Sequence, residues 1–253
     1  RWAGVTAAQL VRRGFTGPPT VLEGRFGFFE AWLHGQFFPA AVTDGLGEEW
    51  SVPGIFFKPY PANHFTHTTV DAGRAFREQG ITPDRVASVV VGVAGSTVRT
   101  VGEPIEVKRA PETGYQAQFS GPYAFAAGLL GGGGLGTGLD DYSDELAQDP
   151  ERRALMAKVD VVADDECNAI YPHQFPAVVT LTTTTGEVLV EKVLTNRGGP
   201  ARPLSDDELA TKFRDNVAGR LDTGTADAVQ SAALGLRAAT DVSDLLSPLK
   251  KEF

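Results

Sequence analysis

The ten residues from Lys58 to His67 hold a set of side chains that can do proton chemistry. The segment Lys58-Pro-Tyr-Pro-Ala-Asn-His-Phe-Thr-His67 contains an ammonium, a phenol and two imidazoles. Its two prolines fix φ near about −65° and so stiffen the turn that carries the lysine. An ammonium can bind a substrate carboxylate, and an imidazole can remove or return a proton. The residue types also fit a structural turn with solvated histidines, because titratable clusters mark functional sites only statistically.

Two histidines are candidates for the acid–base group. His67 is expected in the first turn of a helix, where the positive end of the helix dipole lowers the pKa of an imidazole and favours its neutral form. His64 lies in the loop before that helix. The sequence leaves open which of the two acts.

This segment resembles the central signature of the MmgE/PrpD family, in which Lys-Pro-Tyr-Pro is followed by a short spacer, a histidine and a helix with an Asp-Ala pair. Three other blocks resemble the family in order and spacing, and together they cover nearly the whole chain. They are residues 7–18 with Leu22-Glu-Gly24, residues 117–124 (Ala-Gln-Phe-Ser-Gly-Pro-Tyr-Ala), and residues 203–213 (Pro-Leu-Ser-Asp-Asp-Glu-Leu-Ala-Thr-Lys-Phe). The family includes 2-methylcitrate dehydratases, cis-aconitate decarboxylases and iminodisuccinate epimerases.

The resemblance implies a reaction without cofactor or metal. A proton next to a carboxylate of a small polycarboxylate would be removed, followed by dehydration, decarboxylation or epimerisation. Such a reaction needs a base, a proton donor and cations for the developing charge. The implied roles are acid–base work for His64 or His67, proton donation or orientation by Tyr123, and substrate binding by Lys58, Asn63, Gln118 and Ser120.

One position departs from the family pattern. Relatives place a histidine five residues after the lysine, where this chain has Asn63. An asparagine can hydrogen-bond a carboxylate but cannot move a proton. A decarboxylase mechanism that uses this histidine therefore does not transfer directly. The rival interpretation is a lid or scaffold subunit that has lost the reaction and binds a partner polypeptide.

The spacing of apolar residues predicts helices at both ends of the chain and a mixed middle. We expect Thr66 to cap a helix that ends near Gln79, and a covered strand at Val86–Val93. The other expected elements are helices at 3–13 and 115–130, a helix–helix core formed by the aromatic residues of 22–38, a flexible glycine run at 131–138, a strand at 159–162, a hairpin formed by 177–183 and 187–194, and a capping box at Ser205 and Glu208.

These elements predict an α+β fold class. Residues 1–51 and 202–253 would belong to an all-α domain, and residues 52–201 would form an inserted α+β lid domain. The resemblance implies an active site in the cleft between the two. The boundaries fall where proline and glycine concentrate.

Composition excludes several classes of function. The net charge of −9 argues against a nucleic-acid partner, and no apolar run is long enough to span a membrane. Cys167 is the only cysteine, which excludes an internal disulfide and favours a reducing, cytoplasmic location. Cys167 and His173 are too isolated to predict a zinc site. An acidic chain needs a local cluster of cations to hold an anionic substrate.

The first residues are expected to continue a larger helical part. Arg1-Trp-Ala-Gly-Val-Thr-Ala-Ala-Gln-Leu10 has the spacing of a helix with no capping residue ahead of it, and Met156 is the only methionine. We therefore expect an N-terminal helical half or separate partner subunit, activity only in its presence, and a dimeric assembly like that of the relatives.

Overall fold

The computed structural model describes residues 2–241 and 243–251, which divide into two units at Pro53 and Gly54. The first unit contains short helices and turns. Within it Gly27 is the only described residue that is buried, and Trp2, Phe26 and Trp32 are exposed by 81%, 87% and 73%. The aromatic residues of 22–38 therefore do not form the core that the sequence predicts. The helices are α1 (Trp2–Arg12), α2 (Phe28–Leu33) and α3 (Ala40–Thr43).

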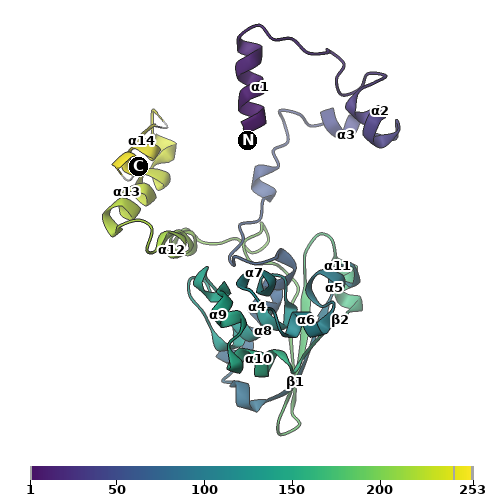
Figure 1. Cartoon of the computed structure of the whole chain (residues 1–253), viewed down its shortest axis with the longest axis vertical. Helices are drawn as coiled ribbons and strands as arrows, with labels where there is room; N and C mark the ends of the chain where they lie inside the picture. The colour runs from purple at the N-terminus through teal and green to yellow at the C-terminus, as the bar shows by residue number, and fades with distance from the viewer. Residues whose placement is uncertain (1, 242, 252–253) are drawn as a thin grey trace. The chain divides into compact units, whose positions relative to one another are not determined.

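A small mixed sheet organises the second unit (Figure 1). Its strands are β1 (Val86–Val93), β2 (Val159–Ala163), β3 (Ala177–Thr183) and β4 (Val188–Val193), in the order β2-β1-β3-β4. The pairs β1–β3 and β3–β4 are antiparallel, and β1–β2 is parallel. Sheet and helices together confirm the α+β class, and the predicted hairpin is present. The lid arrangement around an all-α domain stays a prediction.

One face of the sheet packs against the main core and the other is partly open. Val89, Val91 and Val93 of β1 are buried, whereas Val90 is 39% exposed. The prediction that both faces of this strand are covered was therefore wrong. An apolar run alone does not distinguish a central strand covered on both sides from one covered mainly on one side.

Two helices cross closely over the core. They are α4 (His67–Glu78) and α8 (Gly121–Leu130). A Cβ atom at Gly73 would lie 2.6 Å from the Phe125 carbonyl oxygen, and one at Gly128 would lie 2.3 Å from that of Val70. Only glycine allows the two backbones to approach this closely. The crossing fixes the position of α4, which carries His67 at its first residue.

The predicted helix at 115–130 is two helices. Residues Gly114–Ala117 form α7, and α8 begins after Ser120, whose side chain accepts a hydrogen bond from the Tyr123 amide. Pro122 lies in the first turn of α8, where a proline is tolerated because its missing N–H has no helical partner. A Ser-x-Pro sequence therefore marks a helix start that the apolar spacing alone concealed.

The glycine run 131–138 is held by hydrogen bonds and is not the flexible connection that the sequence predicts. The amides of Gly133 and Gly138 both donate to Asp141 Oδ2, at 2.8 and 2.7 Å. Leu135 and Thr137 are buried. Since this carboxylate already occupies the amides, the run is not a preformed phosphate loop.

The remaining helices lie between the strands along the chain or follow the last strand. The predicted capping box at the start of α12 is present, with Ser205 and Glu208 bonded reciprocally. These helices are α5 (Gly95–Val101), α6 (Ile105–Arg109), α9 (Asp144–Ala147), α10 (Pro150–Met156), α11 (Asp165–Ile170), α12 (Asp206–Val217), α13 (Thr223–Leu234) and α14 (Ser243–Leu246); 3₁₀ turns lie at Val52–Gly54, His64–Thr66, Pro83–Arg85, Asp140–Tyr142, Leu236–Ala238 and Ser247–Lys251.

The close crossing of α4 and α8 makes a prediction about stability. Gly128→Ala places a methyl group against the Val70 carbonyl and should lower the free energy of unfolding by about 1–3 kcal/mol. Gly54→Ala is the control, because a Cβ atom there meets nothing within 4 Å. Denaturant unfolding of both variants checks this. Equal stability of the two would show that the helices can separate without cost.

Candidate active site

The carbonyl oxygen of Ala62 is the meeting point of the predicted cation and one predicted imidazole. Lys58 Nζ donates to it at 2.9 Å, and His67 Nε2 lies 3.3 Å from it. Because a carbonyl oxygen only accepts, His67 Nε2 carries the proton. In the neutral ring Nδ1 is then an unprotonated acceptor, and it is buried without a hydrogen-bond partner among the described residues.

The turn before α4 is held by Asn63, not by the Thr66 side chain that the sequence predicts as a cap. Asn63 Oδ1 accepts from the Phe65 amide at 2.9 Å, and the Thr66 hydroxyl donates to the Asn63 carbonyl at 2.8 Å. The main-chain N–H of Asn63 donates to the main-chain carbonyl of Gln118, also at 2.9 Å. Asn63 and Gln118, two of the four residues expected to bind substrate, thus contribute to the local structure of the turn.

Ser120, the fourth residue expected to bind substrate, is fully buried at the start of α8. Its hydroxyl donates to the Lys108 carbonyl at 2.5 Å and accepts from the Tyr123 amide at 2.9 Å. These contacts explain why α8 begins here. The structure therefore brings Lys58, Asn63, His64 and His67 together in one turn, with Gln118 beside it through its main chain.

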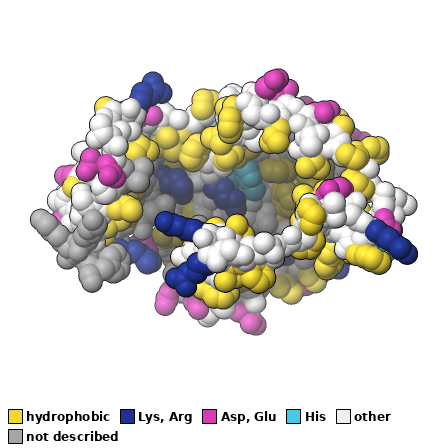
Figure 2. All heavy atoms as spheres, turned by 90° about the horizontal axis from the view of Figure 1, so that it is seen from above, with side chains coloured by type: hydrophobic (Ala, Val, Ile, Leu, Met, Phe, Trp, Pro, Cys, Tyr) yellow, Lys and Arg dark blue, Asp and Glu magenta, His cyan; other side chains and the backbone are white. Residues whose placement is uncertain are grey.

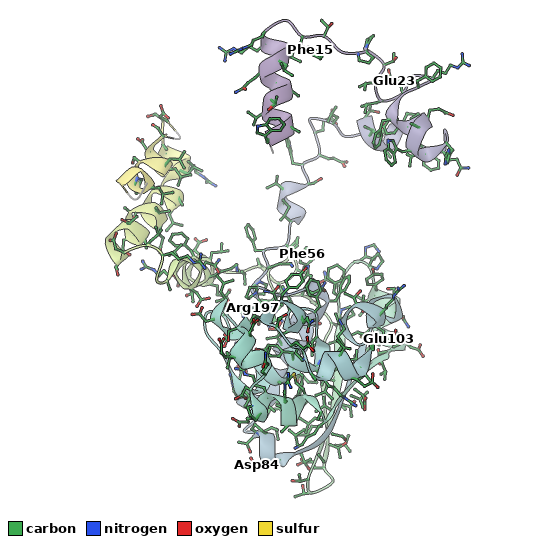
Figure 3. All side chains as sticks on the ribbon, in the orientation of Figure 1. Phe15, Glu23, Phe56, Asp84, Glu103 and Arg197 are labelled. Atoms are coloured by element: carbon green, nitrogen blue, oxygen red, sulfur yellow. The ribbon has the colours of Figure 1, made fainter. Side chains whose placement is uncertain are left out.

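His64 lies in an aromatic cage on top of His67. Its ring centroid is 4.7 Å from that of His67, 4.8 Å from Phe175 and 5.3 Å from Phe56. Phe56 is labelled in Figure 3. Phe175 is held in place because the Thr68 hydroxyl donates to its carbonyl at 2.8 Å. His64 Nε2 is buried without a hydrogen-bond partner among the described residues, so the pair presents two unused ring nitrogens.

Burial and neighbouring lysines keep both imidazoles neutral. Burial, and then the Lys58 ammonium, lowers the pKa of His64 from 6.5 to about 4. Burial, and then His64, lowers the pKa of His67 to about 3, and Lys58 and Lys212 contribute to the same shift. Both imidazoles are therefore neutral at pH 7 with a ring nitrogen free to accept, and the low pKa values make them weak bases in the absence of a bound anion.

Lys212, on α12, is a site residue that sequence reasoning missed. Its own pKa is lowered by burial and, to a smaller extent, by the charge of Lys58, while Asp215 acts in the opposite direction. Lysine and arginine side chains gather beside a histidine on the face shown in Figure 2. A local group of cations is what anion binding by an acidic chain requires. Lys212 lies in the block 203–213 that resembles the family, and this position was the feature of the sequence that could have identified it.

Tyr123 lies apart from the imidazoles. It is fully buried, its hydroxyl donates to the Asp141 carbonyl, and its ring lies 5.4 Å from that of Tyr142. Burial raises the pKa of Tyr123 to about 12. Among the described residues, no hydrogen bond or ring contact joins it to either histidine.

Tyr60 is the tyrosine that contacts the imidazole pair. It is fully buried, and its ring packs edge to face on His67 with centroids 5.3 Å apart. Its hydroxyl donates to Asp71. Burial, and then the charge of Asp71, raises the pKa of Tyr60 to about 12. The two flanking prolines were the signal that this side chain is held in one position.

No metal or nucleophile site emerges in the described part of the chain. There, no three His, Cys, Asp or Glu side chains are grouped to hold a metal ion. Cys167 is buried, and burial followed by Asp164 raises the pKa of its thiol to about 12, which disfavours a reactive thiolate. Within the same residues, no helix has the length and apolar character needed to cross a membrane.

An α+β unit with a lysine beside two neutral imidazoles fits a class of enzymes that move protons next to carboxylates. Residues 60–237 match the model of the MmgE/PrpD C-terminal domain. The chain belongs to the MmgE/PrpD family.

The relatives that this chain matches are named as lyases. The chain is 25% identical to the cis-aconitate decarboxylase-like protein oryM of Aspergillus oryzae, over 99% of this chain and 53% of the relative. It is 24% identical to cis-aconitate decarboxylase of Mus musculus, over 98% and 50%. It is 24% identical to mitochondrial 2-methylcitrate dehydratase of Yarrowia lipolytica, over 90% and 44%. The chain thus spans about half the length of these relatives.

The buried imidazoles make stability depend on pH. Histidines of the unfolded chain take up protons near pH 6.5, but His64 and His67 in the folded chain do so only near pH 4 and 3. Since the unfolded state binds more protons between these values, the free energy of unfolding should fall as the pH drops below about 6.5.

Replacing His64 by glutamine should flatten this fall, as measured by denaturant unfolding between pH 7.5 and 4. His173→Gln, at an exposed position, is the control and should keep the curve of the unsubstituted chain. If His64→Gln and His173→Gln gave the same curve, the buried, neutral state of His64 would be wrong.

Proposed function

We propose that this chain supplies part of the active site of a lyase acting on a small polycarboxylic acid. The reaction begins with removal of a proton next to a carboxylate and ends with loss of water or of carbon dioxide. The names of the relatives, decarboxylases and dehydratases, support the reaction class. An epimerase outcome, which needs only return of the proton, uses the same first step.

The observation that carries the proposal is the shared Ala62 carbonyl. It holds the Lys58 ammonium and the His67 imidazole on the same atom, and the tilted His64 ring lies beside that of His67. A carboxylate of the substrate would replace this carbonyl as the partner of Lys58, since a charged acceptor forms the stronger hydrogen bond. Lys212 supplies a second positive charge nearby.

Substrate binding would also adjust the imidazoles. An anion beside Lys58 and Lys212 screens the charges that contribute to lowering their pKa values, so a bound polycarboxylate raises the proton affinity of His64 and His67. His64 is half-buried, with its Nε2 enclosed, and His67 is fully buried, so the His64 ring is the one nearer to solvent. We propose that either ring can carry the transferred proton, and that His64 is the one that meets the substrate.

Substitutions separate binding from turnover. Lys58→Ala should mainly raise KM, because it removes a carboxylate contact present before and during the reaction. His64→Gln or His67→Gln should lower kcat by about 10²–10⁴-fold, the range for a lost acid–base group. Steady-state kinetics of the complete enzyme with cis-aconitate and 2-methylcitrate checks both expectations. Unchanged kinetics in Lys58→Ala and in the double histidine variant would remove the site assignment.

The donor role expected of Tyr123 requires its hydroxyl to leave the Asp141 carbonyl during the reaction. Tyr123→Phe decides this, because it keeps the ring and removes only the hydroxyl. A loss of turnover with unchanged stability supports proton donation, and a loss of stability with unchanged turnover assigns Tyr123 to packing.

A second candidate function rests on Asn63. Because Asn63 replaces the expected histidine and its side-chain oxygen caps the turn, the chain is also compatible with a lid or scaffold subunit without catalytic activity. Such a subunit would still bind a polypeptide partner. Activity of the complete assembly that depends on His64 or His67 excludes it.

We propose a partner polypeptide, or a further helical part of the same protein, for helices α1 to α3. None of these helices has a buried residue among those described, and Trp2, Phe26 and Trp32 are mostly exposed. The relatives have about twice the length of this chain, so they contain enough sequence for such a cover. A dimer of the complete assembly extends this proposal.

Produced alone, this chain should expose a large apolar surface and self-associate. Co-expression with a second helical polypeptide of the family should yield a soluble complex of defined mass, as measured by light scattering. The triple variant with Trp2→Ser, Phe26→Ser and Trp32→Ser removes the exposed aromatic rings and should reduce both self-association and complex formation. A monodisperse, stable monomer of the unsubstituted chain would contradict the proposal.

A further inference from the structure

The buried hydroxyl of Tyr60 has all of its hydrogen-bonding capacity filled by charged side chains. It donates to Asp71, and it accepts from Arg74 Nη1 at 3.0 Å and from Arg197 Nη1 at 3.3 Å. A phenol has one proton to donate and two lone pairs, so these three contacts complete its set. Few orientations of the Tyr60 ring satisfy all three contacts at once.

The three partners of the Tyr60 hydroxyl come from two separate parts of the fold. Asp71 and Arg74 lie on α4, whereas Arg197 follows β4 and is labelled in Figure 3. Arg197 also donates to the Leu135 carbonyl at 3.0 Å and forms an ion pair with Glu208 of α12. Arg197 therefore ties Tyr60 to the glycine run and to the start of α12.

Glu208 is itself fixed at the start of its helix. One carboxylate oxygen binds Arg197, and the other accepts from the Ser205 amide at 2.8 Å in the capping box. The side chain of Arg197 is only 12% exposed, so its contacts are little screened by solvent. The capping box thus sets the position of Arg197 as well as that of α12.

The other end of this network touches the candidate site. The Tyr60 ring packs on His67, and the next main-chain groups lead through Pro61 to Ala62. The Ala62 carbonyl is the atom that Lys58 and His67 share. An orientation imposed on Tyr60 is therefore passed to both functional groups, through a ring contact and through a stiff turn.

We infer that Arg197, held by Glu208 and bonded to the Tyr60 hydroxyl, is a positioning residue that fixes His67 and Lys58 in the candidate site. The inference rests on the proposed function only in taking these two groups as members of the site. Arg197 does not touch either group itself; it acts through Tyr60. A lysine at this position would keep the charge but could not bond Tyr60, Leu135 and Glu208 from one planar group.

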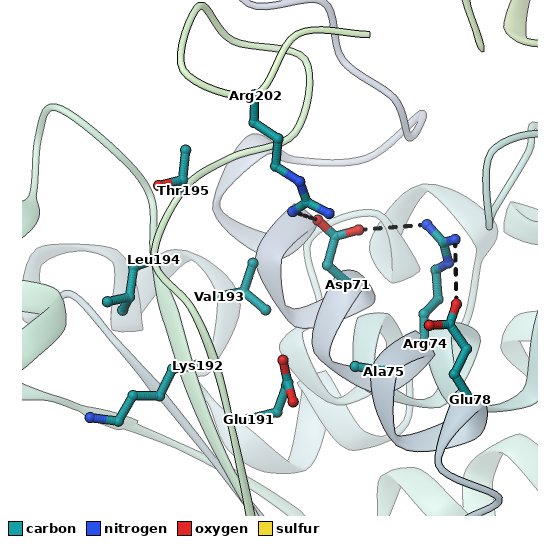
Figure 4. A pocket seen from close by; sticks show the side chains of 10 residues that line it. All are labelled: Asp71, Arg74, Ala75, Glu78, Glu191, Lys192, Val193, Leu194, Thr195 and Arg202. Carbon is teal, nitrogen blue, oxygen red and sulfur yellow. Dashed lines mark hydrogen bonds and ion pairs between the residues drawn. The ribbon is translucent and has the colours of Figure 1, made fainter. Parts of the chain in front are cut away.

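A neighbouring arginine provides a matched comparison. Arg202 binds Asp71 Oδ2 at 3.1 Å from the side of an open pocket of about 450 Å³, and its side chain is 48% exposed (Figure 4). Figure 4 shows Arg202 and Arg74 approaching Asp71 from different directions. Arg202 has no hydrogen bond to the Tyr60 hydroxyl among those of the described residues. Its loss should leave the orientation of Tyr60 unchanged.

The direct test is ¹⁵N NMR of the whole chain with labelled histidine, which gives signals from only four residues. His67 should show a single tautomer with the proton on Nε2. Arg197→Gln and Tyr60→Phe should both replace it by a mixture of tautomers, and Arg197→Lys should not restore it. Arg202→Gln, and Arg214→Gln in an exposed ion pair of α12, should leave the His67 signals unchanged.

Glu208→Gln can keep the capping box with its amide oxygen on the Ser205 amide, and its NH2 group, a donor, then faces Arg197, so that the ion pair and its hydrogen bond are both lost. It should change His67 in the same direction by a smaller amount, and it replaces Arg197→Gln if that variant does not fold. Unchanged His67 signals in folded Tyr60→Phe and Glu208→Gln would overturn the inference.

In the complete enzyme, Arg197→Gln should lower kcat by about 10- to 100-fold, as expected when catalytic groups are displaced slightly, and should change KM less. The kinetic measurement separates the positioning role of Arg197 from the proposed lyase function. Changed His67 signals in a protein without activity on polycarboxylates would sink the proposed function and leave the positioning role intact.

Discussion

The close crossing of α4 and α8 is the constraint on which the site depends. Because Gly73 and Gly128 let the two backbones touch, α4 lies fixed over the core, and its first two turns present His67, Asp71 and Arg74 from one rigid element. The loop 58–66 then has to match this helix. It does so through Asn63, which bonds both the turn itself and the main chain ahead of α8. A side-chain cap from Thr66 is not needed.

Burial explains the electrostatics of the site. The chain is acidic overall, yet the charge of Lys58 acts on both the half-buried His64 and the buried His67, and that of Lys212 acts on His67. Loss of hydration and nearby positive charge both lower the pKa of an imidazole, and so both favour its neutral form over its protonated form. The same lysines favour an anion at this place. Both properties that the proposed function requires of the candidate site, neutral imidazoles and positive charge, have this common origin.

Local patterns in the sequence were sufficient for much of the fold. Alternation around Thr185-Gly186 gave the hairpin of β3 and β4, and Ser205 with Glu208 gave the capping box. Such features depend on neighbours in the chain. The aromatic residues at 22–38 were misjudged because an apolar helix face predicts that something covers it, without saying whether the cover belongs to the same chain.

In the candidate site too, residues that are close in sequence could be predicted, whereas contacts between distant residues could not. Lys58, His64 and His67 could be found because they lie in one short segment. The contact between Tyr60 and Arg197 joins residues 137 positions apart, and the roles of these two residues follow from contacts that sequence spacing does not show. Tyr123 was selected by resemblance of its surroundings, and its hydroxyl lies on Asp141. Sequence spacing identifies candidate side chains, but only the fold shows which phenol lies beside the imidazole.

Three of the sequence blocks that carry the family resemblance meet physically in this structure. The block 58–72 supplies the turn and the imidazoles, the block 117–124 receives the Asn63 amide at Gln118, and the block 203–213 supplies Glu208 and Lys212. Their common order and spacing therefore have a structural reason: each contributes a contact that the others require. Arg197 lies outside these blocks and yet connects two of them. A position that links blocks through a buried phenol can thus be as constrained as the residues of the site itself.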